Sequence, residues 1–295
     1  MISPQFEIQL IAVVTSLACT LAGTFLVLRK MAMMSDAISH SILAGIAIAF
    51  LYTRDIHSPL LIVSATLTGL ATVFLVEMLK NTKLVSEDSA TGLVFTSLFS
   101  IGVIIISKYA RNVHLDTDAV LLGEIAFAPF RRFYIGDIDL GPKSLYIMST
   151  ILFFNIVFIS LFYKELKIAT FDPSLAFVLG ISPNILHYGL MSVVSITAIG
   201  AFDTVGSILV VALMVVPPLT AYLLTDKLKF MIPLSAVLGI LSGVLGYRAA
   251  HFFDLSISGS MATVSGIMFL FAFIISPQKG IWTAFKGDKK TKTSL

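Results

Sequence analysis

Long apolar runs separated by short polar segments dominate the chain. Each run approaches the roughly 20 apolar residues that a helix needs to cross a bilayer. The runs are bounded by charged residues, glycine or proline and lie at about residues 6–28, 36–52, 58–79, 89–107, 145–163, 185–201, 205–224, 230–250 and 257–276. The pattern predicts an all-α fold, a polytopic transmembrane helical bundle with about eight or nine spans.

The composition agrees with this pattern and excludes most soluble classes. Of the 295 residues, 57% are hydrophobic and 13% are charged, and the mean hydropathy is +0.96. An ordinary soluble domain carries about 25% charged residues. The net charge of +3 and the single cysteine, Cys19, provide neither a nucleic-acid-binding surface nor a disulfide framework. We therefore expect one membrane domain over residues 1–280 and no large soluble domain.

The lysines and arginines between the runs predict the orientation, because cytoplasmic loops hold an excess of both. With the amino terminus outside, the inner segments contain Arg29, Lys30, Lys80, Lys83, Lys164, Lys167, Lys227, Lys229, Lys279, Lys286, Lys289, Lys290 and Lys292. The outer segments then contain Arg54, Lys108, Arg111, Arg131, Arg132, Lys143 and Arg248. The bias favours a cytoplasmic carboxyl terminus, with residues 281–295 as a basic cytoplasmic tail.

One long segment, residues 108–144, is too polar to span a membrane cleanly. It contains the run AVLLGEIAF, residues 119–127, which indicates a re-entrant or interfacial helix. Elsewhere, Gly239 and Gly243 form a small-xxx-small pair, a pattern typical of helix contacts in lipid. We interpret this pair as a packing site within a multi-helix bundle.

Two ionisable residues lie inside the second apolar run. An ionisable side chain within a span is costly, so it marks a functional candidate. Asp36 and His40 are four residues apart, which places a carboxylate and an imidazole on one helical face. This pair suits a divalent ion such as Mn, Fe or Zn, whereas dedicated Ca and Mg sites use oxygen alone. The sequence therefore predicts a metal-contact pair that other helices must complete.

Less specific interpretations stay open at this point. Asp36 lies near the start of the run and could cap the helix, and His40 could be an ordinary packing histidine. If the pair binds metal, Ser35, Ser39 and Ser41 are placed to orient it through hydrogen bonds.

Other ionisable residues near the ends of the runs are weaker candidates. Asp203 is a turn residue or helix cap, with a metal contact on the ion pathway as the alternative. His251, in a predicted outer loop, is an interfacial anchor or a metal contact for an entering cation. Glu77 is expected to be solvated, and His187 is expected to lie at the interface.

A short helix between the fifth and sixth runs has signals at both ends. Asp172 is a good N-cap, Pro173 fits the first helical position, and Gly180 fits the residue beyond the last turn. The helix exposes the apolar residues Leu175, Phe177, Val178 and Leu179. Its apolar side either lies on the membrane surface or docks into a groove on a partner protein.

The sequence lacks the short motifs by which a chain of this kind would hydrolyse a nucleotide or act as a membrane enzyme. The sequence has no G-x-x-x-x-G-K-[ST] phosphate loop, no H-E-x-x-H and no G-x-S-x-G. The chain therefore hydrolyses no nucleotide through such a loop, and it shows no catalytic constellation of a membrane enzyme. Transport would be powered by a separate ATPase, or the chain would be a secondary cation transporter or channel powered by an ion gradient, with Asp36 as a proton or sodium carrier.

Three parts of the chain together resemble the membrane permease of bacterial ABC importers for manganese, zinc and iron, the ABC-3 type metal permease family. They are LRKMAMMSDAISHSILAGIAIAF, the capped helix TFDPSLAFVLGIS, and GAFDTVGSILVVALMVVPPLTAYLL followed by DLSISGSMATVSGIMFLFAF. The resemblance runs in order from about residue 10 to 280 and includes the double proline Pro217–Pro218. Ser35 and Ala44 differ from the Gly and Pro of many members.

The resemblance implies partners and roles. The permease acts in the bacterial cytoplasmic membrane as a homodimer or with a related permease, two ATP-binding subunits bind below, and an extracytoplasmic metal-binding protein delivers the ion. Asp36 and His40 then face the pathway and contact the metal in transit. Residues 172–182 form the coupling helix, and the ATPase contact includes Asp172, Pro173, Leu175, Ala176, Phe177 and Gly180.

The expected function is ATP-driven metal import by alternating access, with no permanently bound cofactor. A mixed oxygen and nitrogen pair accepts manganese, zinc or iron. Manganese is favoured because the pair includes a carboxylate and no cysteine lies nearby.

Overall fold

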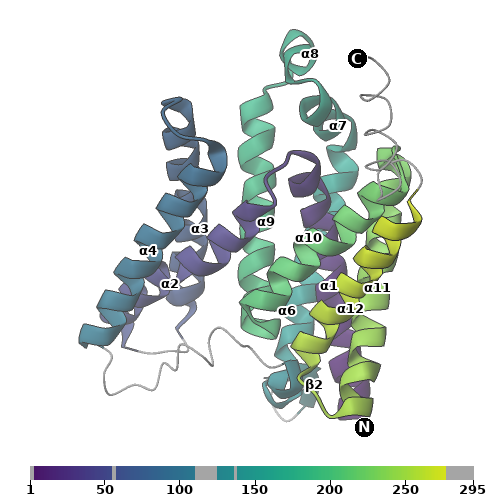
Figure 1. Ribbon diagram of the computed structural model, residues 1–295. Helices are drawn as coiled ribbons and strands as arrows, with labels where there is room; N and C mark the ends of the chain where they lie inside the picture. The colour runs from purple at the N-terminus through teal and green to yellow at the C-terminus, as the bar shows by residue number, and fades with distance from the viewer. Residues whose placement is uncertain (1–2, 55–57, 110–124, 136–137, 277–295) are drawn as a thin grey trace, which may run out of the picture.

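The computed structural model describes residues 3–54, 58–109, 125–135 and 138–276, which are almost entirely helical (Figure 1). Nine of the described helices are long and apolar enough to cross a membrane. They are α1 (Pro4–Leu28), α2 (Met33–Thr53), α3 (Pro59–Asn81), α4 (Glu87–Tyr109), α6 (Lys143–Leu161), α9 (Pro183–Val205), α10 (Ser207–Leu224), α11 (Leu228–Phe253) and α12 (Ile257–Ile275). The predicted all-α membrane bundle is confirmed, and each predicted run corresponds to one helix. The expected tail, residues 281–295, lies outside the described residues.

The spanning helices form two groups. In Figure 1, α2, α3 and α4 lie together on the left, and the other spanning helices form a larger group on the right. Within the larger group, α1 packs against α6, α9, α10 and α11, and its residues Ile11, Ala18 and Leu26 are fully buried. α2 packs mainly against α3 and α4 but also contacts α9 and α10, so it connects the two groups.

Close helix crossings depend on glycine. A Cβ atom on Gly23 of α1 would lie 1.9 Å from the carbonyl oxygen of Met214 in α10, so the two backbones are in direct contact. A Cβ atom on Gly239 of α11 would lie 2.7 Å from the Thr20 side chain of α1, and Gly243 faces the same helix. The interpretation of Gly239 and Gly243 as a packing pair is confirmed, and α1 is the partner.

Polar side chains inside the bundle bond to neighbouring helices. The Nδ2 atom of Asn155 in α6 donates to the Ala18 carbonyl of α1 at 3.1 Å and to Thr197 Oγ1 of α9 at 2.9 Å. The hydroxyls of Ser41 and Thr72, 2.6 Å apart, join α2 to α3. Because the hydrocarbon offers no water, such bonds satisfy the polar groups and hold the helices together.

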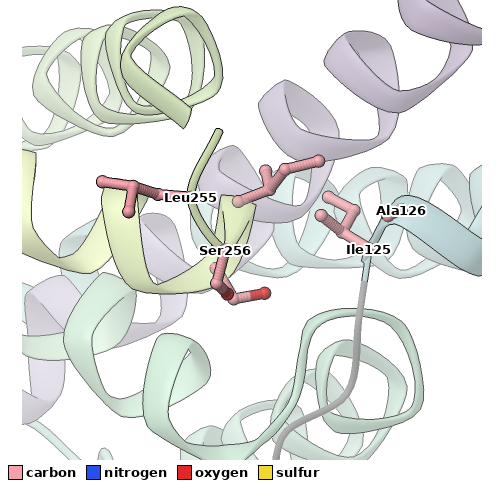
Figure 2. A pocket seen from close by; sticks show the side chains of 6 residues that line it. Ile125, Ala126, Leu255 and Ser256 are labelled. Carbon is pink, nitrogen blue, oxygen red and sulfur yellow. The ribbon is translucent and has the colours of Figure 1, made fainter. Parts of the chain in front are cut away.

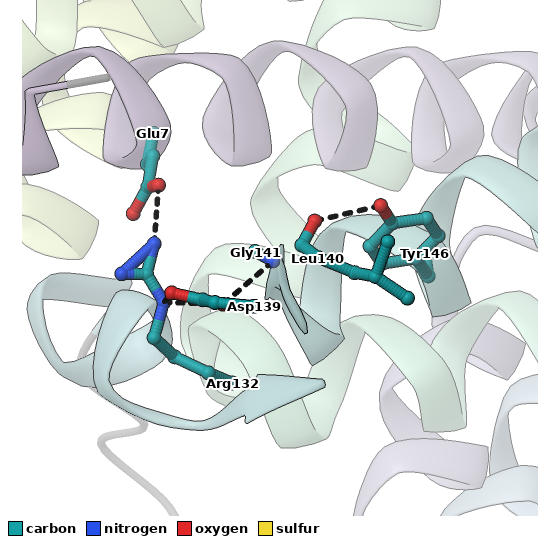
Figure 3. A network of polar contacts seen from close by, with 6 residues as sticks. All are labelled: Glu7, Arg132, Asp139, Leu140, Gly141 and Tyr146. Carbon is teal, nitrogen blue, oxygen red and sulfur yellow. Dashed lines mark hydrogen bonds and ion pairs between the residues drawn. The ribbon is translucent and has the colours of Figure 1, made fainter. Parts of the chain in front are cut away.

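One end of the bundle, which we call the hairpin end, carries a 3-10 helix, η1 (Ile125–Phe130), and two antiparallel strands, β1 (Arg132–Ile135) and β2 (Ile138–Pro142). Arg132 fastens this hairpin to α1 (Figure 3): its Nη2 donates to Glu7 Oε1 at 2.7 Å, and its Nε lies 2.8 Å from Asp139 Oδ2. The Tyr146 hydroxyl of α6 donates to the Leu140 carbonyl at 2.7 Å. These bonds tie the hairpin to two spanning helices.

The sequence does not predict this hairpin. Residues 119–124 of the expected re-entrant or interfacial helix lie outside the described residues, and residues 125–127 begin the short η1. The two strands have four and five residues and pair with each other, with Arg132 opposite Pro142. Strands this short carry too little alternation of apolar and polar positions to be recognised from the sequence.

The opposite end, which we call the α8 end, carries two short helices after α6: α7 (Tyr163–Phe171) and α8 (Pro173–Val178) (Figure 1). Asp172 Oδ1 accepts a hydrogen bond from the Leu175 backbone N–H at 2.9 Å, and Gly180 has a φ of 77°. Both predicted end signals are confirmed, although α8 is shorter than the predicted range 172–182.

α7 is an addition to the predicted elements. The apolar run that predicts α6 ends at residue 163, where α7 begins, and the break between the two helices at Phe162 has no proline or glycine to mark it. A separate apolar cluster supports this end of the bundle; its buried members are Phe25, Ile159, Leu166, Ala169, Ala176, Leu186, Leu190 and Leu228. α7 and α8 are therefore packed onto α1, α6, α9 and α11.

The Gly23 contact predicts a loss of stability on substitution. We expect Gly23→Ala to lower the melting temperature of the purified protein in detergent, because the new methyl group forces α1 and α10 apart. Overpacking of this kind costs about 1–3 kcal/mol. Gly266→Ala in α12 is the matched control, since nothing lies within 4 Å of its Cβ position. Equal melting temperatures for the two variants would contradict the close contact.

Candidate functional site

Asp36 and His40 lie on one face of α2, as their spacing predicts. The His40 Nε2 atom is 3.3 Å from Asp36 Oδ1, and the two side chains retain exposures of 28% and 29%. α2 begins at Met33 with Ala32 as the N-cap, so Asp36 lies in the first turn and does not cap the helix. A carboxylate and an imidazole are thus held together, and both keep access to an ion.

Two phenylalanines of α4 border the histidine. The ring centroids of Phe95 and Phe99 lie 6.0 Å and 5.9 Å from that of His40, and the Phe99 ring is edge-on. α4 therefore provides the aromatic neighbours of the His40 ring.

The three neighbouring serines do not orient the pair. The Ser35 hydroxyl donates to the Ala32 carbonyl at 2.9 Å, and the Ser39 hydroxyl donates to the Ser35 carbonyl at 2.8 Å. Ser41 bonds to Thr72 of α3 and to its own helix. The expectation that these serines orient the metal ligands is wrong, because all three are buried and their hydroxyls bond to backbone carbonyls or to Thr72 instead.

The weaker candidates lie apart from the pair. Among the described residues, no three His, Cys, Asp or Glu side chains come together in a group that could hold a metal ion. Asp203 Oδ1 is 3.2 Å from Arg131 Nη1 at the hairpin end, and both side chains are exposed. His251 is exposed near the end of α11, where its ring stacks on Tyr247. The structure brings neither Asp203 nor His251 to Asp36 and His40.

Two pockets lie at the hairpin end, away from the pair. The first, of about 300 Å³, is lined by residues of η1, including Ile125, and by residues around the start of α12, including Leu255 just before it (Figure 2). Its serines already have partners: the Ser258 hydroxyl donates to the Val205 carbonyl at 3.1 Å, and Ser256 caps α12. The second, of about 240 Å³, is lined by Arg131, Lys143, Ser144, Ile147 and Asp203. Neither pocket is lined by Asp36 or His40.

α8 presents an apolar surface at the opposite end. The exposed apolar residues there are Leu175 at 46%, Phe177 at 75%, Val178 at 80% and Leu179 at 56%. Ala176 is fully buried in the apolar cluster below. The expectation that Ala176 belongs to the contact surface is therefore wrong, because this residue anchors α8 to the bundle instead.

A cluster of polar side chains at the α8 end is not predicted by the sequence. Arg29, Glu77, Thr170 and His187, which we call the Arg29 cluster, form contacts between four segments of the chain. Glu77 pairs with His187 and is not simply solvated, and the His187 side chain is only 15% exposed. Burial lowers the pKa of the Arg29 guanidinium, although arginine stays charged in proteins.

Comparison with protein-family models decides the class of the chain. The model of the ABC 3 transport family matches residues 5–276, nearly the whole sequence. The chain belongs to the ABC 3 transport family. Membership identifies it as a multi-pass permease subunit of an ABC transporter, which is not an enzyme because a separate subunit hydrolyses ATP. The gradient-driven alternative is therefore excluded.

Relatives within the ABC 3 transport family cover almost all of the chain. The manganese transport system membrane protein MntD of Bacillus subtilis is 48% identical over 281 residues, 95% of this chain and 95% of that protein. The zinc transport system membrane protein TroD of Treponema pallidum is 48% identical over 275 residues, 93% of this chain and 75% of that protein. The solved structure of PsaBC from Streptococcus pneumoniae in complex with Fab has a TM-score of 0.76 and 29% identity, and the match covers 92% of each chain.

The two adjacent arginines at the hairpin end of this ABC 3 family permease predict different effects. We expect Arg132→Gln to lower the melting temperature clearly, because it leaves the largely buried Glu7 carboxylate unpaired, at a cost of about 1–3 kcal/mol. Arg131→Gln removes an exposed pair worth about 0–1 kcal/mol, so the melting temperature should barely change. Thermal unfolding in detergent measures both, and equal shifts would contradict the role assigned to Arg132.

Proposed function

We propose that this permease carries a divalent transition metal, with manganese favoured over zinc and iron, from the outside to the cytoplasm. The observation that carries the proposal is the Asp36–His40 pair, two metal-ligating side chains 3.3 Å apart and partly exposed on a membrane-spanning helix. One carboxylate and one imidazole match the ligand preferences of these metals. The names of the relatives, which include manganese and zinc transport proteins, support the same cargo.

A second permease subunit completes the pathway in this proposal. Among the residues that the structure describes, one chain brings two such ligands together, fewer than a stable metal site needs. The same pair on a facing copy, or on a related permease, would supply the rest at the interface. A site assembled in this way holds the ion only moderately, as transport requires, because an ion bound too tightly is not released.

The two ends of the bundle have different partners in this proposal. The α8 end faces the cytoplasm, as the excess of lysine and arginine at this end predicts. There the exposed residues Leu175, Phe177, Val178 and Leu179 dock into an apolar groove of the ATP-binding subunit. The hairpin end faces outward and receives the ion from an extracytoplasmic metal-binding protein. ATP-driven closure of the ATPase subunits moves α8 and switches the access of the metal pair between the two sides.

Metal accumulation tests the role of the pair. We expect cells that express the complete transporter to accumulate manganese, and Asp36→Asn or His40→Gln to reduce the accumulation at least tenfold, because each change removes one ligand. Elemental mass spectrometry at matched membrane abundance is the measurement, with zinc and iron determined in the same samples. A larger gain of zinc or iron would correct the cargo and keep the pathway.

The chain offers a matched control for this experiment. Asp226→Asn makes the same chemical change as Asp36→Asn at an exposed position between α10 and α11. We expect it to keep accumulation within twofold of the wild type. Normal accumulation by Asp36→Asn and His40→Gln would overturn the proposal, since the ion would then have to cross elsewhere.

Docking of α8 is tested by co-purification. We expect Phe177→Ser to reduce the amount of ATP-binding subunit recovered with the tagged permease at least fivefold, because it removes an exposed aromatic ring from the contact surface. Phe252→Ser is the matched control: Phe252 is 82% exposed but lies near the hairpin end of α11. Full recovery of the ATP-binding subunit with Phe177→Ser would show that α8 is not the docking element.

A further inference from the structure

The Arg29 cluster joins four segments that are far apart in the sequence. Arg29 directly follows α1, Glu77 lies in the last turns of α3, Thr170 lies near the end of α7, and His187 lies in the second turn of α9. All four side chains are partly or largely buried at the α8 end. The cluster therefore connects the larger helix group with the group that contains α2, α3 and α4.

The hydrogen bonds of the cluster have a defined direction. Arg29 Nε donates to Thr170 Oγ1 at 3.2 Å, and Arg29 Nη1 lies 3.3 Å from His187 Nδ1. A guanidinium can only donate, so Nδ1 is the acceptor and the ring proton is on Nε2. That Nε2 atom lies 3.3 Å from Glu77 Oε1. The bonds thus run from Arg29 through a neutral His187 to the Glu77 carboxylate.

Both flanks of α8 reach the same guanidinium. Thr170 lies three residues before α8, and His187 lies in the helix that follows it. α8 itself is short and is capped by Asp172. A displacement of α8 with its flanking segments therefore moves Arg29 or breaks at least one of its two bonds.

The other side of the cluster leads to the metal pair. Arg29 lies four residues before Met33, where α2 begins, and seven residues before Asp36. Glu77 belongs to α3, which packs along α2. The cluster thus holds α2 at two places: through the connection that precedes it and through its neighbour.

Two atoms of the cluster are unpaired. Arg29 Nη2 and Glu77 Oε2 are buried without a hydrogen-bond partner among the described residues. Arg29 and Glu77 carry opposite charges and contact the two ring nitrogens of His187 from different sides. A direct bond between Arg29 and Glu77 can therefore replace the contacts through His187 when the helices shift.

We propose that Arg29, His187 and Glu77 are positioning residues that couple movement of α8 to the metal pair on α2. The inference rests on the proposed function, in which α8 docks on the ATP-binding subunit and Asp36 and His40 contact the ion. The cluster does not touch the ion. It sets the position of α2 and α3 according to the position of α8, so that ATP hydrolysis is converted into transport.

The test measures transport and ATP hydrolysis on the same samples. The complete transporter, with its ATP-binding subunits and metal-binding protein, is placed in lipid vesicles, and Mn²⁺ uptake per ATP hydrolysed is determined. His187→Leu removes both the acceptor and the donor, and we expect uptake per ATP to fall at least tenfold. Hydrolysis and co-purification of the ATP-binding subunit should stay within twofold of the wild type, which a general loss of structure would not allow.

Conservative and control variants sharpen the result. His187→Gln keeps one acceptor and one donor, and we expect it to restore uptake per ATP to within threefold of the wild type. Thr263→Val is the control: it removes an exposed hydroxyl that donates to the Gly259 carbonyl within α12, and it should leave the ratio unchanged. Thr170→Val removes one hydroxyl with little change of shape, and we expect it to lower the ratio at least threefold. If His187→Leu does not fold, the uptake per ATP measured for Thr170→Val tests the proposal instead.

Two results would overturn the coupling role. One is a wild-type ratio of uptake to hydrolysis in both His187→Leu and Thr170→Val. The other is a parallel fall of uptake and hydrolysis, which would indicate a structural role. Failure of the proposed function itself looks different: the wild-type transporter takes up no Mn²⁺, Zn²⁺ or Fe²⁺, or Asp36→Asn transports normally, and either outcome overturns both proposals.

Discussion

The absence of water from the hydrocarbon core is the constraint on which this structure depends. Every backbone group in a span must bond within its own helix, and every buried polar side chain needs a partner inside the protein. The Asn155 side-chain amide donates hydrogen bonds to two neighbouring helices, α1 and α9. Asp36 and His40 pair with each other, and both side chains stay partly exposed. Lipid disfavours such a pair, so its presence on α2 supports the proposal that it contacts a charged cargo.

Structural features that depend on residues close together in the sequence could be predicted from it. The nine spans follow from the length of each apolar run, and the Asp36–His40 contact follows from a spacing of four residues on a helix. The ends of α8 follow from Asp172 and Gly180, because capping depends on neighbouring residues alone. Gly239 and Gly243 indicate a close helix contact, although the sequence does not name α1 as the partner.

Features that depend on distant residues could not be predicted. Arg29 is separated from Thr170 by 141 positions and from His187 by 158. A single sequence shows ionisable residues at the ends of spans but not which of them meet. The prediction for the serines of α2 was wrong for a related reason: proximity to Asp36 in sequence does not reveal that Ser35 and Ser39 bond to backbone carbonyls and that Ser41 bonds to Thr72 of α3. The hairpin is held by Glu7, which lies far from it in the chain.

Two arginines fasten α1, one near each end of the helix. Arg132 binds Glu7 near its first turn, and Arg29 at its other end bonds to the segments around α8. α1 has 25 residues, and at about 1.5 Å per residue a helix of this length reaches across a bilayer. A hydrogen-bonded helix hardly stretches, and Gly23 fixes this one against α10. α1 is therefore a rigid connection between the two membrane surfaces, and the hairpin cannot be mechanically independent of the α8 end.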